Sequence, residues 1–429
     1  MRRSFFFALL LVSSSAFADE ITPERAQVLT NVSSALKTSA FVPGIDLTRW
    51  DVIAAESKDK FAAAKTDDDF AREVNAALRK FGASHFRFMT PRQDETRRTQ
   101  KTIGLGLTVA GSTGGPAGGA VAQAAKPTPP STSGLKVNAV GPGSPADKAG
   151  IKAGDIVLKI DGKPATREAL QGEEGKTVKL LLKGRKEQEL KFAPYSLRRP
   201  ATLTKVDDTT ALFRLPTFST GYDRAEVEKC ITEATKYPNL IVDLRNNGGG
   251  AVVSMQHLMG LFMPSDANVG TFVTRPLVNA YSEKNKLKGT PDPVAIANWS
   301  RYAPSWSNRQ IRPAAREGGP LYKGNLAVLV NRGSASASEI FASAAHDVIG
   351  ADVIGTRSMG AVLVSVFRSV GSGFSLQYPT SDYVTVRDRR LEANPIVPVV
   401  EDNDPNAEVL KASYVLHRAQ LRKERFGKS

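Results

Sequence analysis

Apolar and polar positions alternate in blocks through the second half of the chain, and the blocks predict strands and helices in turn. Two short, continuous runs rich in Val and Leu, 240–244 and 326–330, have the pattern of buried strands. The other elements follow the same alternation: strands at 210–215 and 353–355, hairpin-like strands up to residue 385, and helices at 225–236, 252–263 and 334–348. This order predicts an α/β core with a mixed sheet, paired largely in parallel.

The first hundred residues have a different, helical periodicity. Phe61, Phe70, Val74, Leu78 and Phe81 recur at helix spacing, and the polar run just before Phe70, at residues 66–69, suits a helix start. We therefore expect an N-terminal helical region over residues 19–101.

Residues 102–196 change character again and resemble a PDZ domain. A strand, a short helix beginning near Ser144 and the G-D-x-apolar pattern from Gly154 to Gly162 follow one another in the PDZ order. A Gly/Ala/Pro/Ser-rich stretch, 111–134, is predicted to be a flexible insertion. The resemblance implies a loop whose backbone N–H groups bind a peptide carboxylate, unless the domain is only a spacer or lid. The residues of that loop are Gly104, Leu105, Gly106 and Leu107.

The beginning of the sequence predicts export. A basic start, an apolar run over residues 5–12 and Ala16-Phe17-Ala18 make a secretory signal peptide, 1–18, cleaved near Ala18. No cysteine follows the apolar run to suggest a lipoprotein anchor, and no later stretch is apolar enough to span a bilayer. We expect a periplasmic or secreted protein without a transmembrane anchor.

Composition narrows the possible partners. The formal net charge is +15, yet the basic residues are scattered and no basic stripe interleaved with aromatic residues appears, which argues against nucleic acid. A basic C-terminal tail is expected at 411–429. The chain has one cysteine and four scattered histidines, so we expect no internal disulfide, no metal site and no cofactor.

Two segments carry candidate chemistry. The strand at 326–330 runs into a turn and a serine-rich helix start, where the helix dipole stabilises an anion, although serine is also an ordinary helix cap. The strand at 240–244 runs into Asn246-Asn247-Gly248-Gly249-Gly250, a turn able to expose successive N–H groups. No Lys-Ser/Thr follows it, which removes a nucleotide-binding P-loop.

Together, the PDZ segment, D-L-R-N-N-G-G-G and S-A-S-A-S-E resemble the C-terminal processing (tail-specific) peptidases. The resemblance covers most of residues 20–405 and implies a crotonase/ClpP-like peptidase core at 197–410, interrupted by a Pro/Asn/Ser/Trp-rich insertion at 266–320. It implies that Ser336 is the nucleophile and that N–H groups of Gly248 or Gly249 and of Ala337 hold the oxyanion. The usual lysine base is replaced by Ala361, and its supporting glutamine by Ser365.

A sister branch resembling the tricorn core lacks this lysine. There a Ser-His pair near the start of the peptidase region supplies the base and a later Glu supports it, which implies His85, Ser84 and Glu392 here. Glu401 and Asp402 compete with Glu392. The other histidines, His257, His346 and His417, lie in helical stretches and are expected to be structural or surface residues.

The predicted function is therefore an exported serine endopeptidase that hydrolyses protein or peptide substrates with Ser336 activated by His85. Two alternatives stay open. The first alternative is a catalytically silent peptide-binding relative, because Ala361 replaces the family lysine. The second alternative is a serine esterase that acts on a small molecule. Turnover of a disordered protein by the wild type and by variants at Ser336 and His85 separates them.

Overall fold

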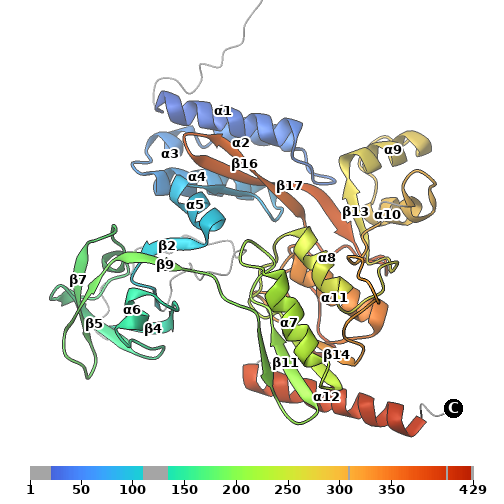
Figure 1. Ribbon diagram of the computed structural model, residues 1–429. Coiled ribbons are helices and arrows are strands. Elements are labelled where there is room, and N and C mark those ends of the chain that lie inside the picture. Colours follow the sequence, from blue (N-terminus) through green and yellow to red (C-terminus); the bar gives the residue numbers. More distant parts are fainter. Residues whose placement is uncertain (1–20, 110–133, 308–309, 402–403, 427–429) are drawn as a thin grey trace, which may run out of the picture.

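The computed structural model describes residues 21–109, 134–307, 310–401 and 404–426. The signal peptide expected at 1–18 and nearly all of the 111–134 insertion lie outside the described residues. Figure 1 shows an N-terminal helical region packed on a long β-hairpin, a small β domain beside it, and an α/β core crossed on its outer side by the last helix.

The N-terminal region is built of short helices, as the periodicity predicted. Thr66 caps a helix that begins at Asp67, with the Thr66 side chain and the Asp69 carboxylate each accepting the other's backbone N–H. Phe70 lies in the buried face of this helix, and its ring packs edge-to-face on Phe88 and Phe374. The elements are α1 (Pro23–Thr38), α2 (Trp50–Ala55), α3 (Lys58–Ala62), α4 (Asp67–Leu78), β1 (Arg87–Met89) and α5 (Pro91–Thr99).

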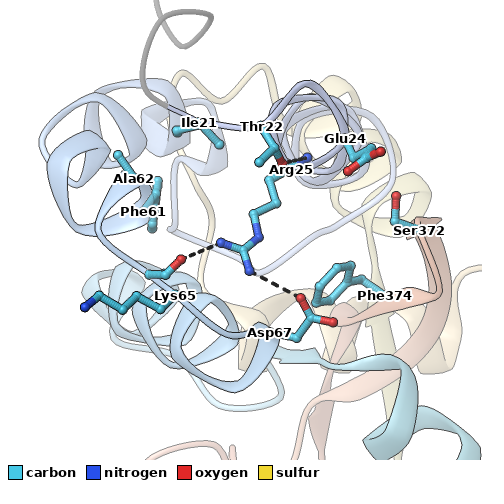
Figure 2. A pocket seen from close by; sticks show the side chains of 11 residues that line it. Ile21, Thr22, Glu24, Arg25, Phe61, Ala62, Lys65, Asp67, Ser372 and Phe374 are labelled. Carbon is cyan, nitrogen blue, oxygen red and sulfur yellow. Dashed lines mark hydrogen bonds and ion pairs between the residues drawn. The ribbon is translucent and has the colours of Figure 1, made fainter.

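A cavity of about 460 Å³ opens in this region between α1 and α4 (Figure 2). Arg25 reaches across it to the Ala64 carbonyl oxygen at 2.6 Å and to the Asp67 carboxylate at 3.3 Å. None of the residues predicted for the active site lines this cavity.

An antiparallel sheet joins the helical region to the core. Its central strand β17 (Phe374–Val384) pairs along its length with β16 (Val364–Gly371) and, on its other edge, with β1 and β13 (Thr271–Thr274). The segment 266–320, expected to lie over one edge of the core as an insertion, therefore contributes a strand to this sheet. It also forms α9 (Arg275–Asn285) and α10 (Pro293–Tyr302), which cover that strand.

The small domain has its own core around Val137, Val157, Leu180 and Phe192. The strand expected from Ile103 to Leu107 is broken because Gly106 adopts a φ of +83°, pressed so close to Ser144 that a Cβ would lie 2.1 Å from its side chain. The elements are β2 (Lys101–Gly104), β3 (Leu107–Val109), β4 (Leu135–Val140), α6 (Pro145–Lys148), β5 (Ile156–Ile160), β6 (Lys163–Pro164), β7 (Thr177–Leu182), β8 (Gln188–Lys191) and β9 (Ala193–Ser196).

The core sheet runs in the order β10-β11-β12-β14-β15-β18, and all its pairs except β10·β11 are parallel, as predicted. Successive side chains point to opposite faces, so β12 sends Leu240 and Val242 towards one face and Ile241 towards the other. The strands are β10 (Thr202–Lys205), β11 (Thr210–Arg214), β12 (Asn239–Asp243), β14 (Asn325–Val330), β15 (Asp352–Gly355) and β18 (Val400–Glu401).

Helices cover both faces of this sheet. The first face carries α7 (Arg224–Ala234), α8 (Val252–Gly260) and α11 (Ala337–Ile349), and the second carries α12 (Pro405–Phe426). The segment 411–429, expected as a basic tail, thus lies largely in a helix that packs Ala412 and Leu416 on the sheet. Within the described part of the chain, no helix is both long and apolar enough to cross a membrane.

Candidate active site

The serine-rich turn follows β14 at the carboxyl end of the parallel strands. Helix α11 begins at Ala337, three residues later than the pattern from Ser334 predicted, because Ser336 holds the turn in a strained backbone conformation (φ +55°, ψ −118°). A positive φ is uncommon for a residue with a side chain and persists only where the surrounding structure enforces it. The positive φ therefore distinguishes Ser336 from the other residues of the turn.

The three serines of the motif have different surroundings. Ser334 and Ser338 are buried, and their hydroxyls donate hydrogen bonds of 2.8 Å to the carbonyl oxygens of Leu244 and Asn247. Ser336, between them, is only half-buried. The outer two serines therefore fasten this turn to the segment 244–247 that leads into the glycines, and Ser336 is the most exposed of the three.

The glycine turn lies directly against Ser336. Gly249 adopts a φ of +90°, and a Cβ added to it would lie 2.8 Å from the Ser336 Cβ and 2.9 Å from the Ala337 nitrogen. The Gly249 N–H donates to the Asn247 side-chain oxygen at 2.9 Å. That amide is engaged within the turn, so Gly248 and Ala337 are the better candidates for oxyanion donors. Sequence reasoning did not foresee the role of Asn247.

This close approach gives a testable consequence for Gly249→Ala. The new methyl group would meet the Ala335 carbonyl oxygen at 2.7 Å as well as Ser336, so if Ser336 is the nucleophile that the sequence predicts, we expect kcat for peptide hydrolysis to fall about 10²-fold through its misplacement. Gly154→Ala is the matched control, because Gly154 has a similar φ of +97° with open space around it. Backbone strain alone should cost each variant about 1 kcal/mol of stability, and the close contacts add to this cost only in Gly249→Ala. An equal loss of kcat in both variants would refute the contact.

Ser84, His85 and Glu392 meet, although 308 residues separate the serine from the glutamate. The Ser84 N–H donates to Glu392 Oε1 at 2.9 Å, and the Ser84 hydroxyl donates to Glu392 Oε2 at 2.9 Å. The same hydroxyl lies 2.6 Å from His85 Nδ1. Glu401, the competing carboxylate, is exposed on β18, and Asp402 lies outside the described residues.

The number of hydrogen atoms available in this network determines which ring nitrogen of neutral His85 carries the proton. A hydroxyl has one hydrogen, and if Ser84 gives it to the carboxylate, Ser84 can only accept from Nδ1–H of His85. Neutral His85 then carries its proton on Nδ1 and an unprotonated, basic Nε2. The backbone is again strained here, with φ of +63° at His85 and +62° at Ala393, as is common where a site is held in place.

The loop containing Ala361 joins the network of Ser84, His85 and Glu392 to Ser336. The Ser336 N–H donates to the Ala361 carbonyl oxygen at 2.9 Å, and the next residue, Val362, donates its N–H to Glu392 Oε2 at 2.9 Å. Two consecutive residues thus contact the two halves of the site. At the position of the family lysine, this chain uses backbone atoms to hold the site together.

The side chain of Glu339 also binds the loop that contains Ala361, a role that the sequence did not reveal. Its buried carboxylate accepts N–H groups of Ser336 at 3.0 Å, Gly360 at 2.8 Å and Ala361 at 3.0 Å, and the hydroxyl of Ser358. Burial raises the pKa of Glu339 above its usual range, and these hydrogen bonds oppose the rise. The S-x-x-E spacing of a capping box was the available signal.

The electrostatics at His85 favour the neutral imidazole. Desolvation lowers the pKa of the half-buried His85 from 6.5 to about 4, and the nearby Glu392 charge opposes this shift. His85 is therefore unprotonated, and able to accept a proton, over the whole neutral range.

The other histidines have different roles. His257 is buried, with Nδ1 2.7 Å from the Tyr222 hydroxyl and Nε2 2.9 Å from Glu228. His346 and His417 are exposed.

The residues predicted for the PDZ carboxylate loop lie together, at the break between β2 and β3. The carbonyl oxygen of Leu105 accepts the Ala146 N–H at 2.9 Å, and that of Gly106 accepts the Gly141 N–H at 2.8 Å. Strand β3, which follows, stands at the end of its sheet and is paired only with β4 among the described residues.

Two segments of the chain match known domain families. Residues 209–401 match Peptidase family S41, and residues 136–184 match the PDZ domain. The chain thus carries a domain similar to the serine-type peptidases of family S41 together with a domain similar to PDZ.

A relative of this chain is the "Probable CtpA-like serine protease" of Staphylococcus haemolyticus (strain JCSC1435), which is 28% identical over 265 residues, 59% of this chain and 47% of the relative. The chain thus spans about half the length of the curated relatives it matches.

Solved structures resemble the chain more distantly. The photosystem II D1 C-terminal processing protease is 20% identical with a TM-score of 0.48, over 89% of this chain and 94% of that one. The tricorn protease is 16% identical with a TM-score of 0.44, over 92% of this chain and 37% of that one.

Proposed function

We propose that this chain is a serine endopeptidase of the C-terminal processing type in which Ser336 is the nucleophile and His85 its general base. The observation that carries the proposal is the hydrogen-bond network of Ser84, His85 and Glu392, which leaves Nε2 of His85 basic. An imidazole oriented by a polar partner is an effective base for a serine hydroxyl. Ala361 supplies no amine, so a lysine-type mechanism has no base at that position.

In the proposed reaction, His85 takes up a proton and gives it back in each of two steps, acylation and deacylation. His85 Nε2 takes the hydroxyl proton of Ser336 as Ser336 Oγ bonds to the peptide carbonyl carbon. The negative charge moves to the carbonyl oxygen, where N–H groups of Gly248 and Ala337 stabilise it. The C–N bond then breaks and His85 protonates the leaving amine. Water, deprotonated by His85, attacks the acyl carbon; the ester C–O bond breaks, and His85 returns the proton to Ser336 Oγ.

Within the family, we place the chain in a tricorn-core-like branch that works without the lysine. The support is the pair Ser84-His85, which precedes the PDZ domain in the sequence, and Glu392 near the end of the matched peptidase segment, together with their hydrogen bonds. Substrates would be proteins or peptides. The PDZ domain would recruit extended or C-terminal segments as an added strand beside β3.

We propose the location of the protein in the cell from its sequence. The basic start, apolar run and Ala-x-Ala site direct the chain to export, so we propose a periplasmic or secreted enzyme.

Turnover of a disordered protein, such as casein, tests the activity. Wild-type protein should cleave it into peptides, whereas Ser336→Ala should not. A wild type that neither cleaves nor acylates would favour the silent peptide-binding relative. Cleavage of small esters without any proteolysis would favour the esterase.

The pH dependence distinguishes His85 from a lysine base. Only neutral His85 accepts the proton, so kcat/KM should fall as pH drops through about 4 and stay level up to neutral pH. A lysine, with an ordinary pKa near 10.4, would instead make kcat/KM rise into the alkaline range.

Burial has the larger effect on the pKa of His85 and lowers it, and the charge of Glu392 raises this pKa and with it the pH of the acid limb. Glu392→Gln should therefore move the limb to still lower pH. Tryptophan fluorescence at each pH separates loss of activity from acid unfolding. An acid limb at or above pH 6.5 in the folded protein would contradict the assignment.

A further inference from the structure

The outer face of α12 exposes apolar side chains. Leu410, Tyr414 and Leu421 are 68%, 62% and 52% exposed, and their spacing of four and seven residues places them on one stripe of the helix. Ala412 and Leu416 lie two residues further on, about 200° around the helix, and pack on the core sheet. The apolar stripe therefore points directly away from the protein.

Positive charge lies beside this stripe. The exposed Lys411 and Arg418 both lie along one side of it, and the Arg418 guanidinium lies 5.8 Å from the centre of the Tyr414 ring. The α12 sequence holds five Lys or Arg residues against two Glu residues. One of these, Glu408, is buried and paired with Arg245 at 2.6 Å, so it does not offset the charge of the outer face.

The position of the helix makes this face accessible. Figure 1 shows α12 along the outside of the core sheet, at the end of the molecule farthest from the N-terminal helices. A body bound there would not need to displace the small β domain or the helices of the other sheet face.

We infer that the outer face of α12 docks on an anionic phospholipid surface, with Leu410, Tyr414 and Leu421 entering the headgroup region and Lys411 and Arg418 contacting lipid phosphates. Apolar residues on one stripe with basic residues beside it are the pattern of helices that lie in a membrane interface. A second copy of the chain is the less favourable partner, because it would bring the same basic residues face to face on a protein of net charge +15. The inference goes beyond the peptidase function and does not depend on it.

Co-sedimentation of the full chain with vesicles tests this inference. Wild-type protein should bind vesicles of phosphatidylcholine mixed with phosphatidylglycerol, bind pure phosphatidylcholine weakly, and dissociate at high salt. Arg418→Glu should weaken binding about 10-fold or more, and the double variant Tyr414→Ser/Leu421→Ser should remove it. Val52→Ser, at an equally exposed apolar position (62%) on α2, should bind like wild type.

Two results would overturn the inference. One is wild-type protein that fails to sediment with phosphatidylglycerol vesicles at low salt. The other is a wild-type dimer, measured by sedimentation equilibrium, that Tyr414→Ser/Leu421→Ser converts to monomer while vesicle binding is unaffected. Circular dichroism melts check that the variants remain folded, as expected for side chains that point away from the core.

Discussion

Replacing Ser336 by alanine is expected to lower kcat for peptide hydrolysis by about 10⁴-fold or more, with the fold intact. The change removes the proposed nucleophile and deletes a half-buried hydroxyl, so little packing is lost. The measurement is the initial rate of casein cleavage, with the denaturation midpoint recorded beside it. The midpoint should be close to that of wild type.

Ser338→Ala is the control for this prediction, because Ser338 is two residues away in the same motif. Its hydroxyl donates a buried hydrogen bond to the Asn247 carbonyl, so its loss should cost about 1–3 kcal/mol of stability. Cleavage should remain easily measurable. If Ser338→Ala removed activity as completely as Ser336→Ala while still folded, the choice of nucleophile would be wrong.

Replacing His85 by alanine is expected to lower kcat by about 10²–10⁴-fold, because the general base is lost while Ser336 and the glycine turn stay in place. KM should change less than kcat, since the imidazole acts in the chemical step. Steady-state kinetics on a peptide substrate measure both constants. A His85→Ala variant as active as wild type would show that another group activates Ser336.

The two partners of His85 provide a check on that result. Ser84→Ala and Glu392→Gln should each cost less than His85→Ala, because they orient the imidazole and do not carry the proton. Their effects should not add, since both act through one hydrogen-bond network. Fully additive losses would indicate that Ser84 and Glu392 act independently of each other.

The core of the fold was readable from the sequence where local pattern and burial agree. The strands containing Leu240 and Val328 are buried on both faces, so they appear as continuous apolar runs, and Thr66 marked the start of α4. The hairpin of β16 and β17 was predicted, but its pairing with β1 and β13 was not foreseen. The resulting sheet brings together strands from residues 87 to 384, and such non-local pairing leaves no local signal.

The sequence predicted some residues of the candidate site better than others. Ser336 stands in a strand-turn-helix motif, but its positive φ, which delays α11 to Ala337, has no signature in the sequence. Ser84-His85 is an ordinary dipeptide, and its link to Glu392 came from family resemblance alone. The engagement of the Gly249 amide by Asn247 depends on side-chain geometry that spacing does not encode.

Acylation by a fluorophosphonate probe tests the activation of Ser336 by His85 most directly, because it needs no knowledge of the natural substrate. Wild-type protein should be labelled on Ser336, located by mass spectrometry of the labelled peptide, and Ser336→Ala should not be labelled. His85→Ala, still folded, should be labelled about 10²-fold more slowly or less. Labelling of His85→Ala at the wild-type rate would contradict the assignment of the base.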